Sequence, residues 1–179
     1  GDEPLEQIFD RFIAAGEGRI DHVSGYMDGF KIWQHLYQQK TSGVIRGDEG
    51  FGWSKVYNEN DVRRYTGLVT MQDHRNLKAA EGYGMSIQSI PAGLHRRENE
   101  SLSTWRDRIY HQFRIPVILS ALNEIKCAYV EVVNPLLSRK IIEQVRTLPD
   151  SLRTEKALFK KIVVETSPPV DFAEKPAII

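Results

Sequence analysis

One carboxylate interrupts an apolar run of the chain. Glu131 stands within residues 126–133, where every residue after the first is otherwise apolar. Because a charged side chain is costly to bury, Glu131 must form an ion pair, lie at a strand end or serve a function. The sequence offers it three cations, Arg46, Arg139 and Lys140. A structural ion pair and a functional carboxylate are therefore both open alternatives.

The residues after this run could bind an anion. Asn134 is expected to cap a helix, and Pro135 suits the first helical position because it lacks an N–H group. Ser138 and Arg139 follow in the first turns of that helix. A helix start presents unpaired N–H groups and the positive end of the helix dipole, so Asn134, Ser138 and Arg139 predict a site for a phosphate or carboxylate. The alternative is an ordinary solvated first turn.

A second group of cations flanks the polar segment 94–101. The arginines are Arg96, Arg97, Arg106 and Arg108, and the nearby carboxylates are Glu98, Glu100 and Asp107. Since the two signs balance, this group favours a solvated surface over an anion site.

Signatures of metal and nucleophile chemistry are missing from the sequence. The five histidines have no metal-ligand spacing to another His, Cys or carboxylate, so no metal site is predicted. No nucleophile elbow, phosphate-binding loop or dinucleotide fingerprint occurs either. The single cysteine, Cys127, excludes an intramolecular disulfide, and its apolar surroundings indicate a small buried side chain.

Three segments occur in an order that a known family also shows. They are Val44-Ile-Arg46-Gly47, Ser101-Leu-Ser-Thr104 and Tyr129-Val-Glu131. This set resembles the ADP-ribosyltransferases of the arginine–serine–glutamate class, which carry an arginine strand, a Ser-Thr-Ser strand and a glutamate strand. The resemblance implies that Arg46 and Ser103 position the nicotinamide ribose of NAD and that Glu131 stabilises an oxocarbenium-like centre. The chain departs from the pattern at Ser101-Leu-Ser-Thr104, which begins a helix, and at Tyr129, where the family has an acidic residue or Gln.

Hydrophobic periodicity predicts helices and strands along the whole chain. The predicted helices cover residues 5–16, 21–40, 73–81, 103–113, 116–123 and 134–148, with one more after Pro149. The predicted strands cover residues 44–46, 53–57, 62–71, 85–90, 126–133 and 162–165. The strand at 126–133 is expected to be central, because it is apolar on both faces.

The bulk composition is that of one ordinary globular domain. The chain has 179 residues, of which 41% are hydrophobic and 27% charged. We expect an α/β domain over 1–166, with α+β as the alternative, in which N-terminal helices lead into a mixed sheet. Residues 167–179 are expected to form an extended proline-containing tail. No apolar run is long enough to span a membrane.

Charge balance and missing motifs set the functional expectation. Lys plus Arg equals Asp plus Glu at 24 each, which disfavours a nucleic-acid partner. The sequence therefore predicts a protein-interaction or regulatory module with a protein partner and no cofactor, in the cytoplasm or delivered to a reducing compartment. The alternative is an NAD-using transferase or glycohydrolase of effector or toxin type, with NAD as its cofactor. The oligomeric state is left open.

Overall fold

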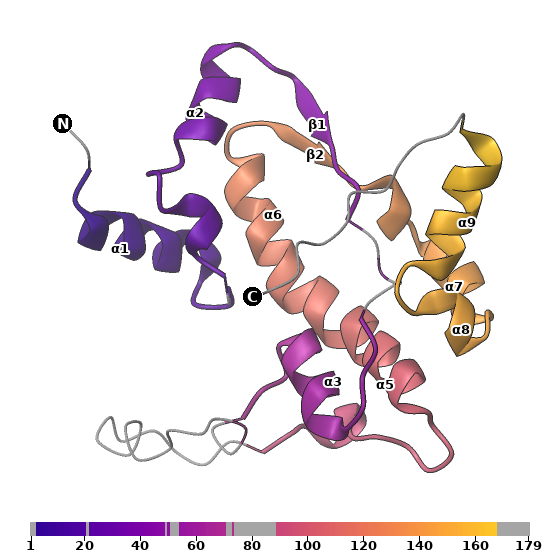
Figure 1. The fold of residues 1–179 in the computed structure, drawn as a ribbon. Coiled ribbons are helices and arrows are strands. Elements are labelled where there is room, and N and C mark those ends of the chain that lie inside the picture. The colour runs from indigo at the N-terminus through magenta and orange to yellow at the C-terminus, as the bar shows by residue number, and fades with distance from the viewer. Residues whose placement is uncertain are drawn as a thin grey trace, which may run out of the picture.

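The described structure is mostly helical and is organised along one long helical segment (Figure 1). The computed structural model describes residues 3–20, 22–48, 50, 54–70, 73 and 89–167. The long segment consists of α5 (Leu102–Ile109), a π-type stretch (Tyr110–Leu119) and α6 (Ser120–Cys127), which follow one another without a break. Other helices pack near its two ends, and a small sheet follows α6.

Capping and π-type geometry explain why this segment is continuous. The Ser101 hydroxyl oxygen accepts the N–H of Thr104 at 3.0 Å and so caps the start of α5. The sequence predicted two helices separated at Pro116, and the structure joins them. Proline removes one N–H and crowds the carbonyl of the preceding α-helical turn. Pro116 lies in the π-type stretch, whose wider turns leave more room between the proline ring and that carbonyl.

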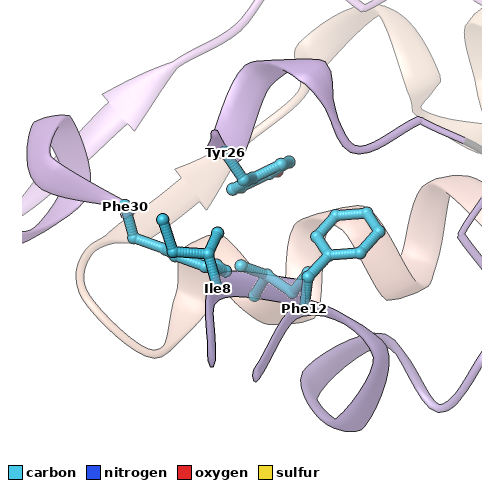
Figure 2. Close-up of a cluster of buried hydrophobic side chains, with 5 residues drawn as sticks. Ile8, Phe12, Tyr26 and Phe30 are labelled. Carbon is cyan, nitrogen blue, oxygen red and sulfur yellow. The ribbon is translucent and has the colours of Figure 1, made fainter. Parts of the chain in front are cut away.

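The first hydrophobic cluster lies between α6 and the N-terminal helix α1 (Leu5–Gly16), which confirms the prediction for 5–16. Figure 2 shows its aromatic centre, where the Tyr26 ring lies 5.4 Å from the Phe12 ring and 5.1 Å from the Phe30 ring. The buried members of this cluster are Ile8, Phe12, Tyr26, Phe30 and Ile125. Gly16 ends α1, where a Cβ atom would meet the Ile20 side chain at 2.0 Å.

The predicted helix over 21–40 is interrupted. A short 3₁₀ turn covers Ser24–Tyr26, and α2 begins only at Lys31 and ends at Gln38. Between them Gly29 and Phe30 have φ of 76° and 65°, the left-handed region that ends a right-handed helix. The Asp28 carboxylate accepts the N–H of Phe30 at 3.0 Å and stabilises this turn. The helical spacing of apolar residues therefore did not produce one continuous helix, because the Asp28 side chain stabilises a turn between Ser24–Tyr26 and α2.

The second cluster forms where α3 (Glu59–Thr66) packs on α5. The sequence predicted a strand over 62–71, and this prediction is wrong. Asn58 accepts the N–H of Asp61 at 2.9 Å, which caps the start of α3. Gly67 then ends the helix in the left-handed conformation. The buried members of this cluster are Val62, Leu68, Trp105 and Ile109.

The sheet consists of two parallel strands, β1 (Gly43–Ile45) and β2 (Glu131–Val133), with Gly43 opposite Glu131. The predicted strand at 44–46 is confirmed to within one residue. The predicted central strand over 126–133 is wrong for its first five residues, because helical hydrogen bonds continue to Val130, whose N–H donates to the Lys126 carbonyl at 3.0 Å. The mixed α/β class therefore holds only loosely, since the sheet is minor.

The C-terminal third of the described chain is helical. A 3₁₀ turn covers Pro135–Leu137, followed by α7 (Arg139–Arg146), α8 (Asp150–Arg153) and α9 (Ala157–Thr166). Three predictions are corrected here: the helix expected from 134 begins at Arg139, the strand expected at 162–165 is part of α9, and residues 54–57 belong to no strand. Most of the predicted elements at 73–81 and 85–90, and the tail after Ser167, lie outside the described residues.

Candidate functional site

The structure brings together only two of the three residues that resemble the transferase family. Arg46 follows β1, and its backbone N–H donates to Val133 of β2 at 2.9 Å, while Glu131 begins β2. Ser103 instead lies in the first turn of α5. Most of the helical segment 102–127 separates it from β2, and at 1.5 Å of rise per residue this length is on the order of 30 Å. Ser103 and Glu131 therefore do not converge.

Arg46 and Glu131 also do not pair with each other. The Arg46 guanidinium donates to both carboxylate oxygens of Asp48, at 2.7 and 3.0 Å, and this hydrogen bonding raises the pKa of Arg46. Glu131 is exposed, and it belongs to none of the ion pairs among the described residues. Of the alternatives that the sequence left open, the structure shows the strand end, because Glu131 is the exposed first residue of the short strand β2.

The three predicted anion-binding residues do not share one helix start. A 3₁₀ turn separates Asn134 from α7, which begins at Arg139 after Ser138. The Arg139 side chain is 91% exposed and pairs with Glu143 at 2.7 Å. The Asn134 side-chain oxygen is buried without a hydrogen-bond partner among the described residues. Asn134 therefore does not cap α7, and anion binding by this group stays a prediction.

Two arginines expected on a solvated surface are buried instead. Arg108 is paired with Glu100 through two hydrogen bonds, of 2.8 and 2.9 Å. Its guanidinium also donates to the carbonyls of Gly93 and His95, at 3.0 and 2.6 Å. Such a two-pronged pair fixes the geometry of both side chains. It holds the polar segment before α5 against the helix, so Arg108 is a structural residue.

Asp107 is the centre of a second buried ionic group. It is 2% exposed and accepts from Arg106 at 2.9 Å and from Arg153 of α8. Arg153 also pairs with Asp150 and donates to the Thr104 hydroxyl at 3.0 Å. These contacts join α5 to α8, and Asp107 and Arg153 are 46 residues apart in the sequence. Each charge has fixed partners, so we interpret this group as structural.

His111 is a half-buried imidazole in the π-type stretch. Its Nε2 lies 2.5 Å from the Gly50 carbonyl oxygen, which only accepts, so Nε2 carries the proton and donates. Nδ1 is then an acceptor, and it is buried with no hydrogen-bond partner among the described residues. Burial lowers the pKa of His111, and the hydrogen bond to Gly50 and the charge of Asp107 oppose this effect, while Arg146 and Arg153 reinforce it.

We expect His111→Gln to reduce the loss of stability on acidification. With the pKa of His111 lowered in the folded state, the unfolded chain binds more protons near pH 6.5, so the free energy of unfolding falls as pH falls through this range. One proton accounts for at most about 1.4 kcal/mol per pH unit. Urea denaturation of the wild-type protein and the variant at several pH values from 7.5 to 5 measures how much the free energy of unfolding of each falls on acidification. The exposed His35→Gln is the control, and equal slopes for all three proteins would contradict the assignment.

Lys126 is a site that sequence reasoning missed. It is 5% exposed, and among the described residues its ammonium nitrogen has one hydrogen bond, from Nζ to the Asn123 side-chain oxygen at 3.3 Å. The Trp33 ring centroid lies 6.0 Å from Nζ. Burial lowers the pKa of Lys126 to about 8, and the positive charge of Arg46 contributes to this shift. The sequence signal was a lysine at the edge of an apolar run, which we interpreted as a strand start.

α1 carries an exposed apolar surface beside its buried one. Leu5, Phe9 and Ile13 are 51%, 36% and 55% exposed and follow one another at a spacing of four residues along the helix. We call these three side chains the α1 face. Glu6 and Asp10, both exposed, border this face on the helix side away from the core.

A cavity of about 420 Å³ opens beside α1. Its lining includes the apolar side chains Ile8 and Met27 and the polar side chains Glu3, Asp28, Lys31 and Gln34. Gly29 also lines it, and there a Cβ atom would lie 3.2 Å from the Glu3 carboxylate, so glycine keeps the wall open. This part of the molecule therefore combines an exposed apolar helix with a polar cavity.

Comparison with known proteins assigns no family. No protein-family model matches the chain, and the searches of curated proteins and of solved structures found no match either. Within the part of the chain that the structure describes, no group of three His, Cys, Asp or Glu side chains could hold a metal ion. In the same residues, no helix has both the length and the apolar character needed to cross a membrane.

Proposed function

We propose that the chain is a protein-interaction module whose partner binds on the α1 face. The observation that carries this proposal is the row of exposed side chains Leu5, Phe9 and Ile13. Single exposed apolar residues are normal, but a contiguous row on one helix supports an interaction surface. Covering three half-exposed side chains of this size would contribute roughly 1 kcal/mol or more for each.

The charges around the α1 face favour a basic partner. Glu6 and Asp10 lie beside the face in exposed positions. Arg11, the only cation of α1, is directed elsewhere: it pairs with Glu3 at 2.7 Å and lies 4.5 Å from the Phe30 ring centroid. The border of the face is therefore acidic. A partner helix with an apolar stripe and lysines or arginines along one edge is complementary to it.

The transferase alternative receives less support. Its chemistry needs Arg46, Ser103 and Glu131 around one nicotinamide ribose. Ser103 lies at the far end of the long helical segment from Glu131, and Arg46 is engaged by Asp48. The geometry thus favours the interaction module over an NAD-using enzyme.

We expect a designed peptide to bind the α1 face. The probe is a fluorescent helical peptide with leucines at positions i, i+3, i+4 and i+7 and lysines along one flank. Its affinity should fall about tenfold or more in Leu5→Ser/Ile13→Ser, which removes apolar area and no charge. It should also fall in Glu6→Lys/Asp10→Lys, which reverses the border charge. Fluorescence anisotropy measures both effects, and circular dichroism checks that the variants stay folded.

Matched controls make this test specific. Val164→Ser changes an apolar side chain on α9 that is 67% exposed, and it should leave the affinity unchanged. A scrambled peptide of the same composition should bind weakly, because its leucines no longer lie on one side. If the scrambled peptide binds equally well, or if Val164→Ser weakens binding as much as Leu5→Ser/Ile13→Ser, the α1 face is not the binding surface.

A further inference from the structure

The backbone of β1 is bonded along one edge only. β1 and β2 lie side by side as a parallel pair (Figure 1), and the Arg46 N–H donates to the Val133 carbonyl at 2.9 Å. In such a pair alternate residues direct both backbone groups to the same neighbour, so Val44 bonds to β2. The backbone groups of Gly43 and Ile45 therefore point to the opposite side. Among the residues that the structure describes, no hydrogen bond reaches them.

These outward backbone groups of Gly43 and Ile45, which we call the β1 edge, are accessible. Gly43 is exposed, and Ile45 is 82% exposed. An exposed strand edge with N–H and carbonyl groups to spare is a template for a further strand. The other edge of the sheet offers less, because within β2 only Val132 directs its backbone groups away from β1. A strand that extends this sheet is therefore expected at the β1 edge.

The β1 edge is complementary to itself. In an antiparallel pair, two opposite residues exchange both of their hydrogen bonds, and the next residues along face each other without bonding. When a second copy approaches with its strand reversed, Gly43 of each copy lies opposite Ile45 of the other. Every backbone group of both edges is then bonded. The two Val44 residues face each other across the two-fold axis, so the arrangement is closed and symmetric.

The same register gathers exposed apolar side chains. Ile45 lies opposite Val133 in the sheet, so the two side chains share one face, and Val133 is 42% exposed. In the symmetric pair the two Ile45 side chains are diagonal neighbours on that face, and Gly43 leaves room between them because it has no side chain. Two Ile45–Val133 pairs then form one apolar patch and cover area that a single copy exposes to water.

The charges at the ends of β1 favour the reversed orientation. Lys40 is exposed and stands before β1, and Asp48 stands after β1 at the same distance along the chain. Reversing one strand brings each Lys40 toward the other copy's Asp48 and keeps the two lysines apart. Asp48 stays paired with Arg46 at 2.7 Å, so this attraction orients the two copies and adds little affinity.

We propose that the β1 edge pairs with the β1 edge of a second copy, antiparallel and across a two-fold axis at Val44, to form a weak homodimer. Because β1 is short, the buried area is smaller than in a standard stable interface, and we expect half-dissociation at a concentration on the order of 100 µM. The β1 edge is separate from the α1 face, so neither proposal depends on the other.

Sedimentation velocity of the full chain from about 10 µM to about 1 mM tests for the dimer. Ile45→Lys places like charges at the centre of the interface and changes a side chain that is 82% exposed, so the monomer should stay folded. We expect this variant to raise the dissociation constant about tenfold or more. Val164→Lys, on α9, and Leu5→Ser/Ile13→Ser, on the α1 face, should leave it unchanged. A monomer at every concentration, or a dimer that Ile45→Lys does not weaken, would overturn the proposal.

Disulfide trapping tests the register. Facing residues of a non-bonded antiparallel pair have Cα atoms about 4.5 Å apart, a distance that a disulfide spans. Val44→Cys, in a Cys127→Ser background that removes the exposed thiol, should therefore cross-link two copies under mild oxidation. Val132→Cys in the same background is the matched control, because Val132 is half-buried like Val44 and lies opposite it, one strand further from the axis.

Non-reducing electrophoresis compares the two cross-linking rates. We expect Val44→Cys to cross-link about tenfold or more faster than Val132→Cys, since the Cα atoms of the control lie too far apart for a disulfide. Both variants shorten a half-buried valine, so any local loosening affects both alike. Equal rates would overturn the antiparallel register and with it the β1 edge as the surface between copies.

Discussion

Asp107→Ala is expected to lower the free energy of unfolding by about 3–5 kcal/mol, the usual cost of removing one partner from a buried ion pair. Asp107 holds Arg106 and Arg153, and all three side chains are buried. Without the carboxylate, two guanidinium groups face each other in a region of low dielectric. Both lose an acceptor that water cannot replace without opening the contact between α5 and α8.

Urea denaturation measures this loss against a matched control. The control is Glu143→Ala, which removes the carboxylate of the exposed Arg139–Glu143 pair on α7. An exposed pair four residues apart in a helix contributes about 0.5 kcal/mol or less. If Asp107→Ala does not fold, Asp107→Asn, which keeps the shape and one acceptor, supplies the comparison. Equal effects of the Asp107 and Glu143 substitutions would show that the buried group does not stabilise the fold.

Lys126→Met is expected to raise the free energy of unfolding at pH 7 by about 2 kcal/mol. The physical reason is the cost of burying an ammonium group with one neutral acceptor, since a pKa lowered from 10.5 to about 8 corresponds to roughly 3 kcal/mol. Methionine has a similar length, is apolar and packs well against the Trp33 ring. Part of the gain is lost with the hydrogen bond to Asn123, so we expect the smaller figure.

The pH dependence distinguishes this explanation from better packing alone. The pKa of Lys126 is lower in the folded state than in the unfolded chain, so the folded state binds fewer protons between about pH 8 and 10.5. The wild-type protein therefore loses stability as pH falls through this window, and the cost is complete below it. The advantage of Lys126→Met should be largest at pH 7 and should shrink by pH 10. An advantage that does not change with pH would contradict the burial argument.

The opposite signs of these two predictions have a functional meaning. Asp107 and its arginines are buried charges that pair with one another within the protein. Lys126 is a buried charge that we expect to weaken the fold, and residues of this kind occur preferentially at functional sites.

Local signals in the sequence were sufficient to predict α1 and β1. α1 was predicted within its bounds because Leu5, Ile8, Phe9 and Phe12 recur at helical spacing, and a helix of this kind forms its hydrogen bonds within itself. β1 was predicted to within one residue, because the helical spacing of apolar residues stops at Gly43 and a short β-rich run follows. α3 carried equally local signals, the cap at Asn58 and the glycine at 67. The strand prediction failed there because apolar content was given more weight than capping.

Tertiary structure decided which of these residues are covered and which charges are paired. Apolar spacing predicts one stripe on α1, but α6 and the 26–30 turn bury only Ile8 and Phe12 and leave the α1 face exposed. The sequence predicts Asp107 as a solvated charge. In the structure α8 places Arg153, which is 46 residues away in sequence, against it. The sequence predicts Lys126 as the start of a strand. In the structure Lys126 lies in the last turn of α6, and the Trp33 ring, which is distant in sequence, lies near its side chain. Burial depends on the residues that approach from elsewhere in the chain, and the pattern within one segment contains no information about them.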